Sequence, residues 1–291
     1  MNVLSLFDGM SCGRIALERA GIPVDAYYAS EVDKYAIKVS GHNYPDIVQL
    51  GDVTKWKEWN IDWSSIDLLI GGSPCQSFSN SGEKLGFDDP RGQLLLCYLE
   101  IRDHILSLNP KLKWFIENVP MKSEHLNKFN EYVGASPVVI NSSLVSALHR
   151  KRLYWCNWSF DLPEDRCIYL KDILVKYATN WLTDKAINRL DVINKRAKEK
   201  GLGYKDCILT GDDKYLNLDA NYFKGADGKR GVINQNGRLR MLTPVECERL
   251  QCVKDGYTDC VSNTQRYKML GNGWTVDVVA HIFENLLENN D

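Results

Sequence analysis

The sequence has no apolar run near the roughly 20 residues that a membrane-spanning helix requires. Its first residues carry no basic stretch and no small-residue cleavage site, so we expect neither a signal peptide nor a membrane partner. Nine cysteines are present, but no two of them form a C-x-x-C pair. An odd count without such pairs argues against a disulfide framework or a zinc cluster. We therefore predict a reducing, cytoplasmic location and no metal site.

A large excess of one charge sign is also missing, because 36 Lys and Arg face 38 Asp and Glu. The distribution is uneven, however. Residues 150–251 hold 20 Lys and Arg against 14 Asp and Glu, while the rest of the chain holds 16 against 24. A basic portion on an acidic body suits a polyanion bound at one face, although asymmetry of this size is also common by chance. Internal repeats and low-complexity tracts are absent, and 291 residues fit one large domain or a domain with an insert.

The N-terminal part alternates short apolar runs with turns and helical patterns. Strands are expected at residues 3–7, 26–30, 47–50, 66–70 and 113–116, and helices at residues 14–20, 32–40 and 93–108. A strand, a glycine-bearing turn and a helix begin a nucleotide-type βαβ unit. This turn reads F-D-G-x-S-x-G, which differs from the G-x-G-x-x-G spacing of dinucleotide-binding enzymes.

Acidic residues stand directly after three of the expected strands. Glu31 comes about 20 residues after the glycine turn, where a ribose hydroxyl is usually held. Asp52 and Glu117 follow two later strands. Each acid alone is more often a structural or helix-capping group. Glu31 and Asp52 together suggest one ligand that carries two sets of donors, such as a ribose and an exocyclic amine.

Cys75 stands just beyond the strand expected at residues 66–70, where open α/β sheets place their ligands. A cysteine in a loop is usually a small apolar residue, so its neighbours must decide its role. Residues 77–92 follow it without a clear period, which is typical of a lid or binding loop. The basic cluster 149–152 leads into a further strand.

From about residue 158 the pattern weakens. Residues 181–200 predict a charged amphipathic helix, and residues 201–238 mix Gly, Asp, Asn and Lys with aromatics in an irregular insert suited to recognition loops. Order returns at Thr243, Pro244 and Glu246, which predict a helix N-terminus with a capping box. A last helix is expected at residues 277–287.

Taken in order, these motifs resemble those of the C5-cytosine DNA methyltransferases, and the ordered set spans nearly the whole chain. Local stretches resemble bacterial restriction-modification enzymes at residues 82–92 and animal de novo methyltransferases at residues 145–150 and 273–276. The commoner bacterial pattern has Gln where His149 stands, so the resemblance gives that side chain no role. The matching motifs are Phe7-Asp8-Gly9-x-Ser11-x-Gly13, Glu31, Asp52, Pro74-Cys75-Gln76, Glu117-Asn118-Val119, His149-Arg150-Lys151-Arg152, Arg240-x-x-Thr243-Pro244-x-Glu246 and Gly271-Asn272-Gly273-Trp274.

The resemblance implies an α/β fold with the Rossmann-like sheet of class I S-adenosylmethionine-dependent methyltransferases and a smaller irregular target-recognition region. It divides the chain into a catalytic and cofactor-binding part at residues 1–157, a target-recognition region at residues 158–238 and a C-terminal catalytic part at residues 239–291. The implied reaction moves a methyl group from S-adenosylmethionine to carbon 5 of a cytosine flipped out of duplex DNA.

The resemblance also implies residue roles. The thiolate of Cys75 would add to carbon 6, and Glu117 would stabilise charge toward N3. Arg152, with Arg150 nearby, would bind O2 and orient Glu117, while Asn118 would order the loop behind them. The implied cofactor contacts are Phe7, Asp8, Gly9, Met10, Ser11, Cys12, Gly13, Glu31, Val32, Asp52, Val53, Pro74, Leu94, Asn272, Trp274 and Val276. The implied DNA contacts are Gln76, Ser77, Ser79, Ser81, Arg91 and Arg240.

The absence of regulatory domains suggests a bacterial or phage enzyme, as a monomer or homodimer, acting alone or beside a cognate restriction endonuclease. A transfer-RNA cytosine methyltransferase of the same fold would use the same residues, and the basic insert favours DNA over it. A catalytically silent DNA-binding homologue would have lost the nucleophile or the cofactor residues, which are present here. A nicotinamide-dependent oxidoreductase would share the first βαβ unit but leave Cys75 and Glu117 unexplained.

Overall fold

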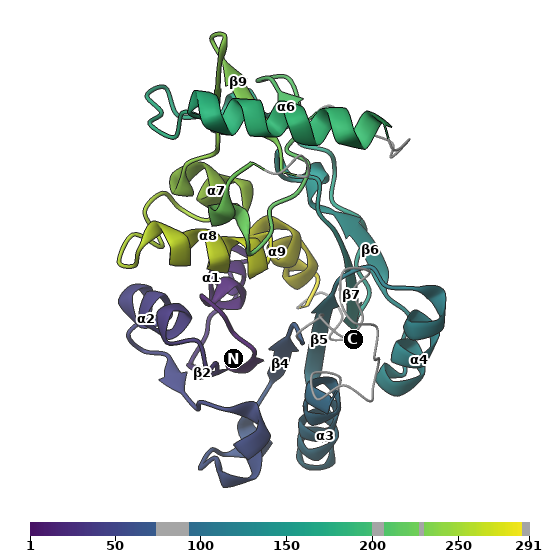
Figure 1. Ribbon diagram of the computed structural model, residues 1–291. Helices are drawn as coiled ribbons and strands as arrows, with labels where there is room; N and C mark the ends of the chain where they lie inside the picture. The colour runs from purple at the N-terminus through teal and green to yellow at the C-terminus, as the bar shows by residue number, and fades with distance from the viewer. Residues whose placement is uncertain (74–92, 200–206, 227–229, 287–291) are drawn as a thin grey trace. The chain divides into compact units, whose positions relative to one another are not determined.

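The computed structural model describes residues 1–73, 93–199, 207–226 and 230–286. Within these ranges, no helix is long and apolar enough to cross a membrane. The chain forms two compact units, and Figure 1 draws both. The first comprises Met1–Ile140, Lys151–Leu162 and Val278–Asp291, and the second comprises Asn141–Arg150 and Pro163–Asp277. Residues 239–277, which the sequence assigned to the catalytic part, thus group with the recognition region.

A seven-stranded sheet in the order β3-β2-β1-β4-β5-β7-β6 forms the centre of the first unit. Its first five strands in this order run parallel, and β7 runs antiparallel to β5. Because β1 lies between β2 and β4, the strand order reverses there, which is where such sheets bind ligands beyond their carboxyl ends. The strands are β1 (Asn2–Leu6), β2 (Ala26–Ser30), β3 (Val48–Gln49), β4 (Leu68–Gly71), β5 (Lys113–Asn118), β6 (Val138–Asn141) and β7 (Lys151–Cys156).

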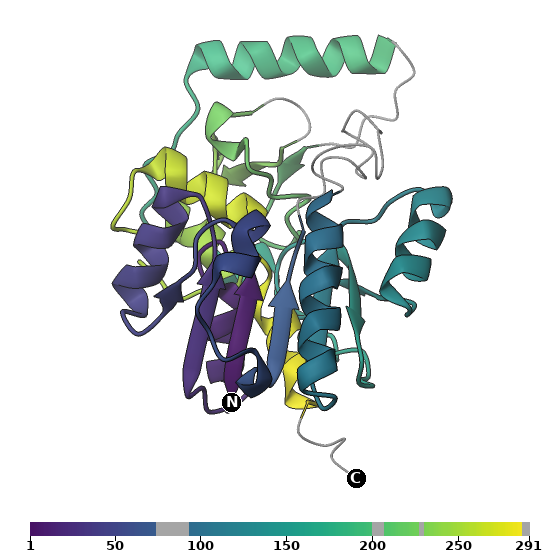
Figure 2. The same ribbon diagram turned by 90° about the horizontal axis from the view of Figure 1, so that it is seen from below.

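Helices cover both faces of this sheet. Side chains alternate along a strand, so Trp114 and Ile116 of β5 join the core beneath α3. Phe115 points to the other face, where its ring centroid lies 5.3 Å from that of Phe283 in α9. Figure 2 shows α3, in blue-teal, running alongside β4. The helices are α1 (Cys12–Arg19), α2 (Lys34–Asn43), α3 (Gln93–Leu108), α4 (Ser123–Val133) and α9 (Val276–Glu284), with 3₁₀ turns at Val53–Glu58 and Trp63–Ser65.

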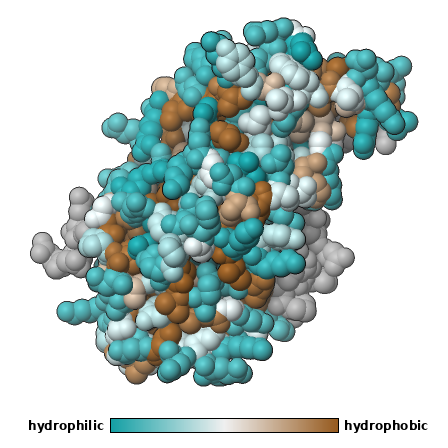
Figure 3. Space-filling view, turned by 90° about the vertical axis from the view of Figure 1, so that its left-hand side faces the viewer, coloured by the Kyte–Doolittle hydropathy of each residue, from teal (hydrophilic) through white to brown (hydrophobic). Residues whose placement is uncertain are grey.

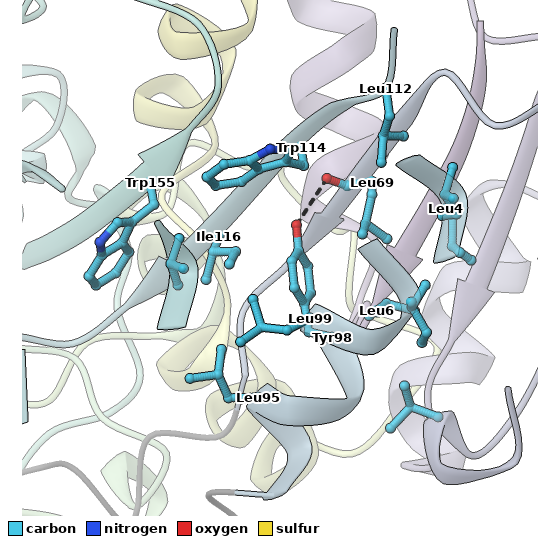
Figure 4. Close-up of a cluster of buried hydrophobic side chains, with 14 of the residues drawn as sticks. Leu4, Leu6, Leu69, Leu95, Tyr98, Leu99, Leu112, Trp114, Ile116 and Trp155 are labelled. Atoms are coloured by element: carbon cyan, nitrogen blue, oxygen red, sulfur yellow. Dashed lines mark hydrogen bonds between the residues drawn. The ribbon is translucent and has the colours of Figure 1, made fainter. Parts of the chain in front are cut away.

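Tyr98 of α3 fixes the end of β4 from within this core (Figure 4). Its hydroxyl donates to the carbonyl oxygens of Phe115 at 2.9 Å and Leu69 at 3.3 Å. The ring lies so close to Gly71 that a Cβ there would approach it to 3.1 Å. Glycine at the last position of β4 therefore lets the helix approach the strand that leads toward Cys75.

The second unit is less irregular than the sequence suggested. Residues 207–240 include a three-stranded sheet of β8 (Ile208–Leu209), β9 (Val232–Gln235) and β10 (Arg238–Arg240). Asn236 and Gly237 both adopt positive φ, at 54° and 81°, so an Asn-Gly turn of hairpin type connects β9 to β10. The helices of this unit are α5 (Leu170–Ile173), α6 (Asp184–Glu199), α7 (Pro244–Leu250) and α8 (Asn263–Asn272).

Candidate active site

The turn after β1 has an unusual backbone. Phe7, Gly9 and Ser11 have φ of 58°, 60° and 63°, all in the left-handed region. That region costs a residue with a side chain about 1–2 kcal/mol. Such strain persists only where surrounding contacts hold it, and it is concentrated at ligand-binding and catalytic sites. The predicted cofactor turn is thus a shaped segment rather than an ordinary strand-to-helix connection.

Glu31 ties this turn to the end of β2. Its Oε2 accepts a hydrogen bond from the backbone N–H of Gly9 at 2.7 Å, and its Oε1 accepts from Val32 and Asp33 at 2.7 and 2.8 Å. A carboxylate has about four acceptor positions, so Glu31 retains capacity for a ligand hydroxyl. The Val32 side chain beside it is 72% exposed. Figure 3 shows apolar residues scattered among polar ones, so a single exposed apolar side chain is not by itself a sign of a ligand. The exposed Val32 side chain suggests a ligand contact only because it lies beside the acceptor groups of Glu31.

The other predicted cofactor residues of the first unit divide by exposure. Asp52 is exposed and caps the 3₁₀ turn that follows it, accepting from the Thr54 N–H and hydroxyl, both at 2.9 Å. These bonds hold the pKa of Asp52 below its usual value, so it carries a negative charge. Leu94 packs against the core beneath α3. The side chains of Asp8, Met10, Cys12 and Val53 are buried, as is Gly13.

Glu117 and Arg152 form an ion pair at the carboxyl end of β5. Arg152 Nε lies 3.0 Å from Glu117 Oε1, and the side chains are 16% and 11% exposed respectively. The antiparallel register places Glu117 opposite Tyr154 of β7, so Arg152 reaches it from two residues away. The structure therefore brings together the two charged groups that the sequence assigned to the base.

Asn118 connects the ends of β4 and β5. Its Nδ2 donates to Ser73 Oγ at 3.1 Å and to the Ser73 carbonyl at 3.4 Å, while its Oδ1 accepts from the Val119 N–H. These bonds hold Ser73, which the sequence alone had not singled out, and the role of Asn118 in ordering the neighbouring loop stays a prediction. Pro74, Cys75, Gln76, Ser77, Ser79, Ser81 and Arg91, with the loop at residues 77–92, lie outside the described residues.

Arg150 does not have the exposed guanidinium expected of a residue that binds the base. It is 5% exposed and donates to the carbonyl oxygens of Leu218, Gly271, Asn272 and Gly273 at 3.0–3.5 Å. Three of these carbonyls end α8, where unpaired acceptors and the helix dipole favour a cation. These bonds engage its donors inside the second unit and give Arg150 a structural role, while its catalytic role stays a prediction.

Arg240 is fully buried, which contradicts its predicted DNA contact. Its guanidinium donates to both carboxylate oxygens of Glu246 at 2.8 and 2.6 Å, to Gln235 and to the Met241 carbonyl. Glu246 also completes the predicted capping box with Thr243. The motif is therefore a buried ion pair that joins β10 to α7.

The C-terminal motif forms the turn between α8 and α9. Asn272 is exposed at the end of α8, Trp274 is half-buried and Val276 is buried. Gln251 holds this turn by donating to the carbonyls of Leu270 and Gly273 at 2.6 and 3.2 Å, a role that no sequence motif indicated. Among the described residues, no cluster of His, Cys, Asp and Glu could hold a metal ion.

Comparison with known proteins assigns the chain to a family. Residues 1–135 and 160–288 match the model of the C-5 cytosine-specific DNA methylases. The type II methyltransferase M1.ScrFI of Lactococcus lactis subsp. cremoris is 30% identical over 318 residues, which cover 98% of this chain and 78% of that protein. M.HhaI of Haemophilus parahaemolyticus is 28% identical over 317 residues, which cover 98% and 94%.

Solved structures share the fold. The Entamoeba histolytica methyltransferase EhMeth superposes with a TM-score of 0.76 at 20% identity, covering 100% of this chain and 99% of that one. The S. pombe Dnmt2 methyltransferase gives 0.70 at 18% identity, covering 99% and 98%. The predicted α/β fold of class I methyltransferases is confirmed, and so is the resemblance. The chain belongs to the C-5 cytosine-specific DNA methylase family.

Proposed function

We propose that this chain is an S-adenosylmethionine-dependent DNA (cytosine-5-)-methyltransferase that acts on a cytosine flipped out of duplex DNA. Family membership supports the reaction. The observation that carries the assignment to this site is the Glu117–Arg152 pair at the end of β5. Beside it, the bond from Asn118 fixes Ser73, two residues before Cys75.

Cys75 is the proposed nucleophile. Carbon 5 of cytosine is a weak nucleophile, and addition of the Cys75 thiolate to carbon 6 converts the ring into an enamine that reacts at carbon 5. After methylation, a base removes the carbon 5 proton and the thiolate is eliminated, which restores the aromatic ring. The thiolate is thus regenerated at the end of each turnover.

Glu117 and Arg152 are proposed to stabilise the charge that thiolate addition creates. Negative charge develops toward N3 and O2 of the ring, and donors held in place before the reaction stabilise it without reorganisation. Arg152 uses Nε for Glu117 and Nη1 for the Lys151 carbonyl, and its remaining N–H groups are suited to O2. Glu117, sharing a proton with N3, would complete the pocket for the ring.

The first unit has groups suited to S-adenosylmethionine, which supplies an electrophilic methyl group when bound. Glu31 retains acceptor capacity for ribose hydroxyls, and Asp52 is an exposed, ionised acceptor for the adenine amine. Phe7 and exposed Val32 offer apolar surface for the base. The strained backbone at Gly9 suits close approach of the methionine portion. Asn272, Trp274 and Val276 are proposed as further contacts on the resemblance alone.

The second unit is proposed to read the DNA target. The type II names of the relatives lead us to propose a cognate restriction endonuclease as partner, in the cytoplasm of a bacterial or phage-infected cell. Whether the chain is a monomer or a homodimer stays a prediction.

The assay is transfer of a tritiated methyl group to duplex DNA and, in parallel, to transfer RNA. We expect labelling of DNA alone, and none by Cys75→Ser. Labelling of transfer RNA alone would show that the substrate is RNA and not DNA. Full activity of Cys75→Ser would show that Cys75 is not the nucleophile. Bisulfite sequencing of DNA from cells that express the chain then gives the recognition sequence.

A further inference from the structure

A buried carboxylate lies beneath the strained turn that follows β1. The residue is Asp8, and its side chain accepts hydrogen bonds from the Ser11 hydroxyl and from the Tyr27 hydroxyl, the latter at 2.7 Å. The Ser11 hydroxyl in turn lies 2.5 Å from that of Ser40. These partners come from the start of α1, from β2 and from α2. One carboxylate therefore joins the turn to two neighbouring elements.

The position of Ser11 shows that this network shapes the turn. Ser11 is the N-cap residue of α1, yet its side chain makes no capping hydrogen bond and it stands at φ 63°. A serine at an N-cap normally accepts from the backbone of the first turn. Here the hydroxyl is directed to Asp8 instead, so the helix gives up a cap while the left-handed conformation is held.

The turn is fixed from two sides. Asp8 holds Ser11 from within, and Glu31 holds the Gly9 N–H at 2.7 Å. The backbone between these two anchors is the segment proposed to approach the methionine portion of the cofactor. Its strain of about 1–2 kcal/mol per left-handed residue must be offset by these bonds.

The surroundings of Asp8 contain little positive charge. From β2 and the residue after it, the titratable groups that act on Asp8 are Tyr27 and Glu31, and Ser5, Ser11 and Ser40 contribute hydroxyls. Arg14 of α1 lies over the ring of Tyr27 at 6.0 Å and pairs with Asp46. Burial is the main reason that the pKa of Asp8 rises to about 6, and the charge of Glu31 adds to it.

We propose that ionised Asp8 is a positioning residue that holds the turn from Phe7 to Ser11 in its cofactor-binding conformation, so that cofactor affinity falls when Asp8 takes up a proton. The proposal rests on the proposed function. A protonated carboxyl must donate one hydrogen bond, whereas Ser11 and Tyr27 both donate to it now. One of its hydroxyl partners, which also include Ser5, must then accept from it instead of donating, and this change rearranges the hydrogen bonds that hold the turn.

Titration calorimetry of S-adenosylhomocysteine with the full chain between pH 5 and 8 tests this. Wild-type Kd should be constant above pH about 7 and rise about tenfold toward pH 5. Asp8→Asn keeps the shape but lacks the charge, so its Kd should be about tenfold weaker at pH 7.5 and lose this pH dependence. The matched control is Asp62→Asn, an exposed cap at another turn of the same unit.

Amide exchange of residues 7–13 in the ligand-free protein provides a second readout, with faster exchange expected in Asp8→Asn at equal pH. Should Asp8→Asn fail to fold, Tyr27→Phe removes one donor to Asp8 and should weaken binding in the same direction. Unchanged Kd in the folded variant would overturn the role of Asp8. Absence of any binding by the wild type would instead overturn the proposed cofactor.

Discussion

Arg152 lies across the antiparallel pair of β5 and β7, with its Nε 3.0 Å from Glu117 Oε1. Both side chains are mostly but not fully buried, so the pair is shielded from water while it stays reachable by a ligand. At such a site, charge–charge contacts are stronger than at the surface. Either group therefore matters for a reaction that develops negative charge, as thiolate addition to cytosine does.

Glu117→Gln should lower kcat by about 10²–10³-fold, because the amide cannot share a proton with N3. Arg152→Lys keeps the charge but loses the planar set of donors, so a loss of similar size is expected. Single-turnover methylation measures the chemical step, and S-adenosylhomocysteine binding is the control. Retained kcat in both variants would place the chemistry elsewhere.

Asn118→Ala should slow methylation by loosening the connection to Ser73. The lost bonds are buried, and leaving the Ser73 groups unpaired costs about 1–3 kcal/mol. Cofactor affinity should hardly change, because the side-chain hydrogen bonds of Asn118 go to Ser73 and Val119, which are not among the residues proposed for the cofactor. Ser73→Ala removes only the hydroxyl bond and serves as the matched, milder variant. If Asn118→Ala weakened cofactor binding as much as it slowed methylation, the two effects would not be separate and this prediction would be wrong.

Arg150→Ala should destabilise the fold by about 3 kcal/mol, because four carbonyl oxygens lose a shared buried donor. Urea unfolding of the full chain measures the loss, and Arg166→Ala removes an exposed arginine of the same unit as control. A variant that keeps wild-type stability but loses kcat would instead support the catalytic role that the sequence suggested.

Sequence patterns predicted the strands and helices of the first unit well, because each is a local apolar period bounded by turn residues. The roles of arginines were harder, since they depend on partners far away in the chain. Arg150 binds carbonyls 68 to 123 residues later, and nothing near it reveals them. The partner of Arg240, Glu246, is only six residues later in the chain. The sequence nevertheless does not distinguish a buried arginine from an exposed one.

The insert at residues 201–238 was expected to be irregular because its composition is polar. The Asn236-Gly237 pair is a known hairpin signal, and it does connect β9 to β10. The apolar runs beside it are too short for a period to stand out. Tyr27 and Gln251 were missed for another reason, since each acts through polar side-chain bonds that have no sequence signature.

Arg238→Ala should weaken DNA binding. The exposed guanidinium of Arg238 lies 4.3 Å from the ring of Trp181, which precedes α6 and is bonded through Leu182 to β10. Stacking orients the donors before DNA arrives. If Arg238 contacts a phosphate, the salt slope falls by about 1, and if it contacts a guanine, specificity relaxes at one position.

Fluorescence anisotropy at several salt concentrations measures the slope, and bisulfite sequencing reports the specificity. Arg249→Ala is the control, because Arg249 is paired with Asp255 and bound to the Ile173 carbonyl. Unchanged affinity, slope and specificity in Arg238→Ala would exclude the hairpin from DNA contact.

Asp8→Asn should make the protein more stable at neutral pH while it weakens cofactor binding. Because the folded-state pKa is raised to about 6, the wild type binds extra protons when folded, and its stability falls as pH rises from about 4 to 6. Above pH 6 the folded protein bears the full free-energy cost of ionising the buried Asp8 carboxyl, which is up to about 3 kcal/mol. The uncharged amide of Asp8→Asn avoids this cost, but it weakens one of the hydrogen bonds at this position, which is worth about 1 kcal/mol.

Thermal and urea unfolding at pH 4 and pH 7.5 measure this. We expect Asp8→Asn to gain about 1–2 kcal/mol over the wild type at pH 7.5 and to gain nothing at pH 4. A purely structural carboxylate would behave differently, since its removal would cost stability at pH 7.5 together with affinity. Greater stability combined with weaker cofactor binding would show that the buried charge is retained for the conformation of the turn, at the expense of the fold.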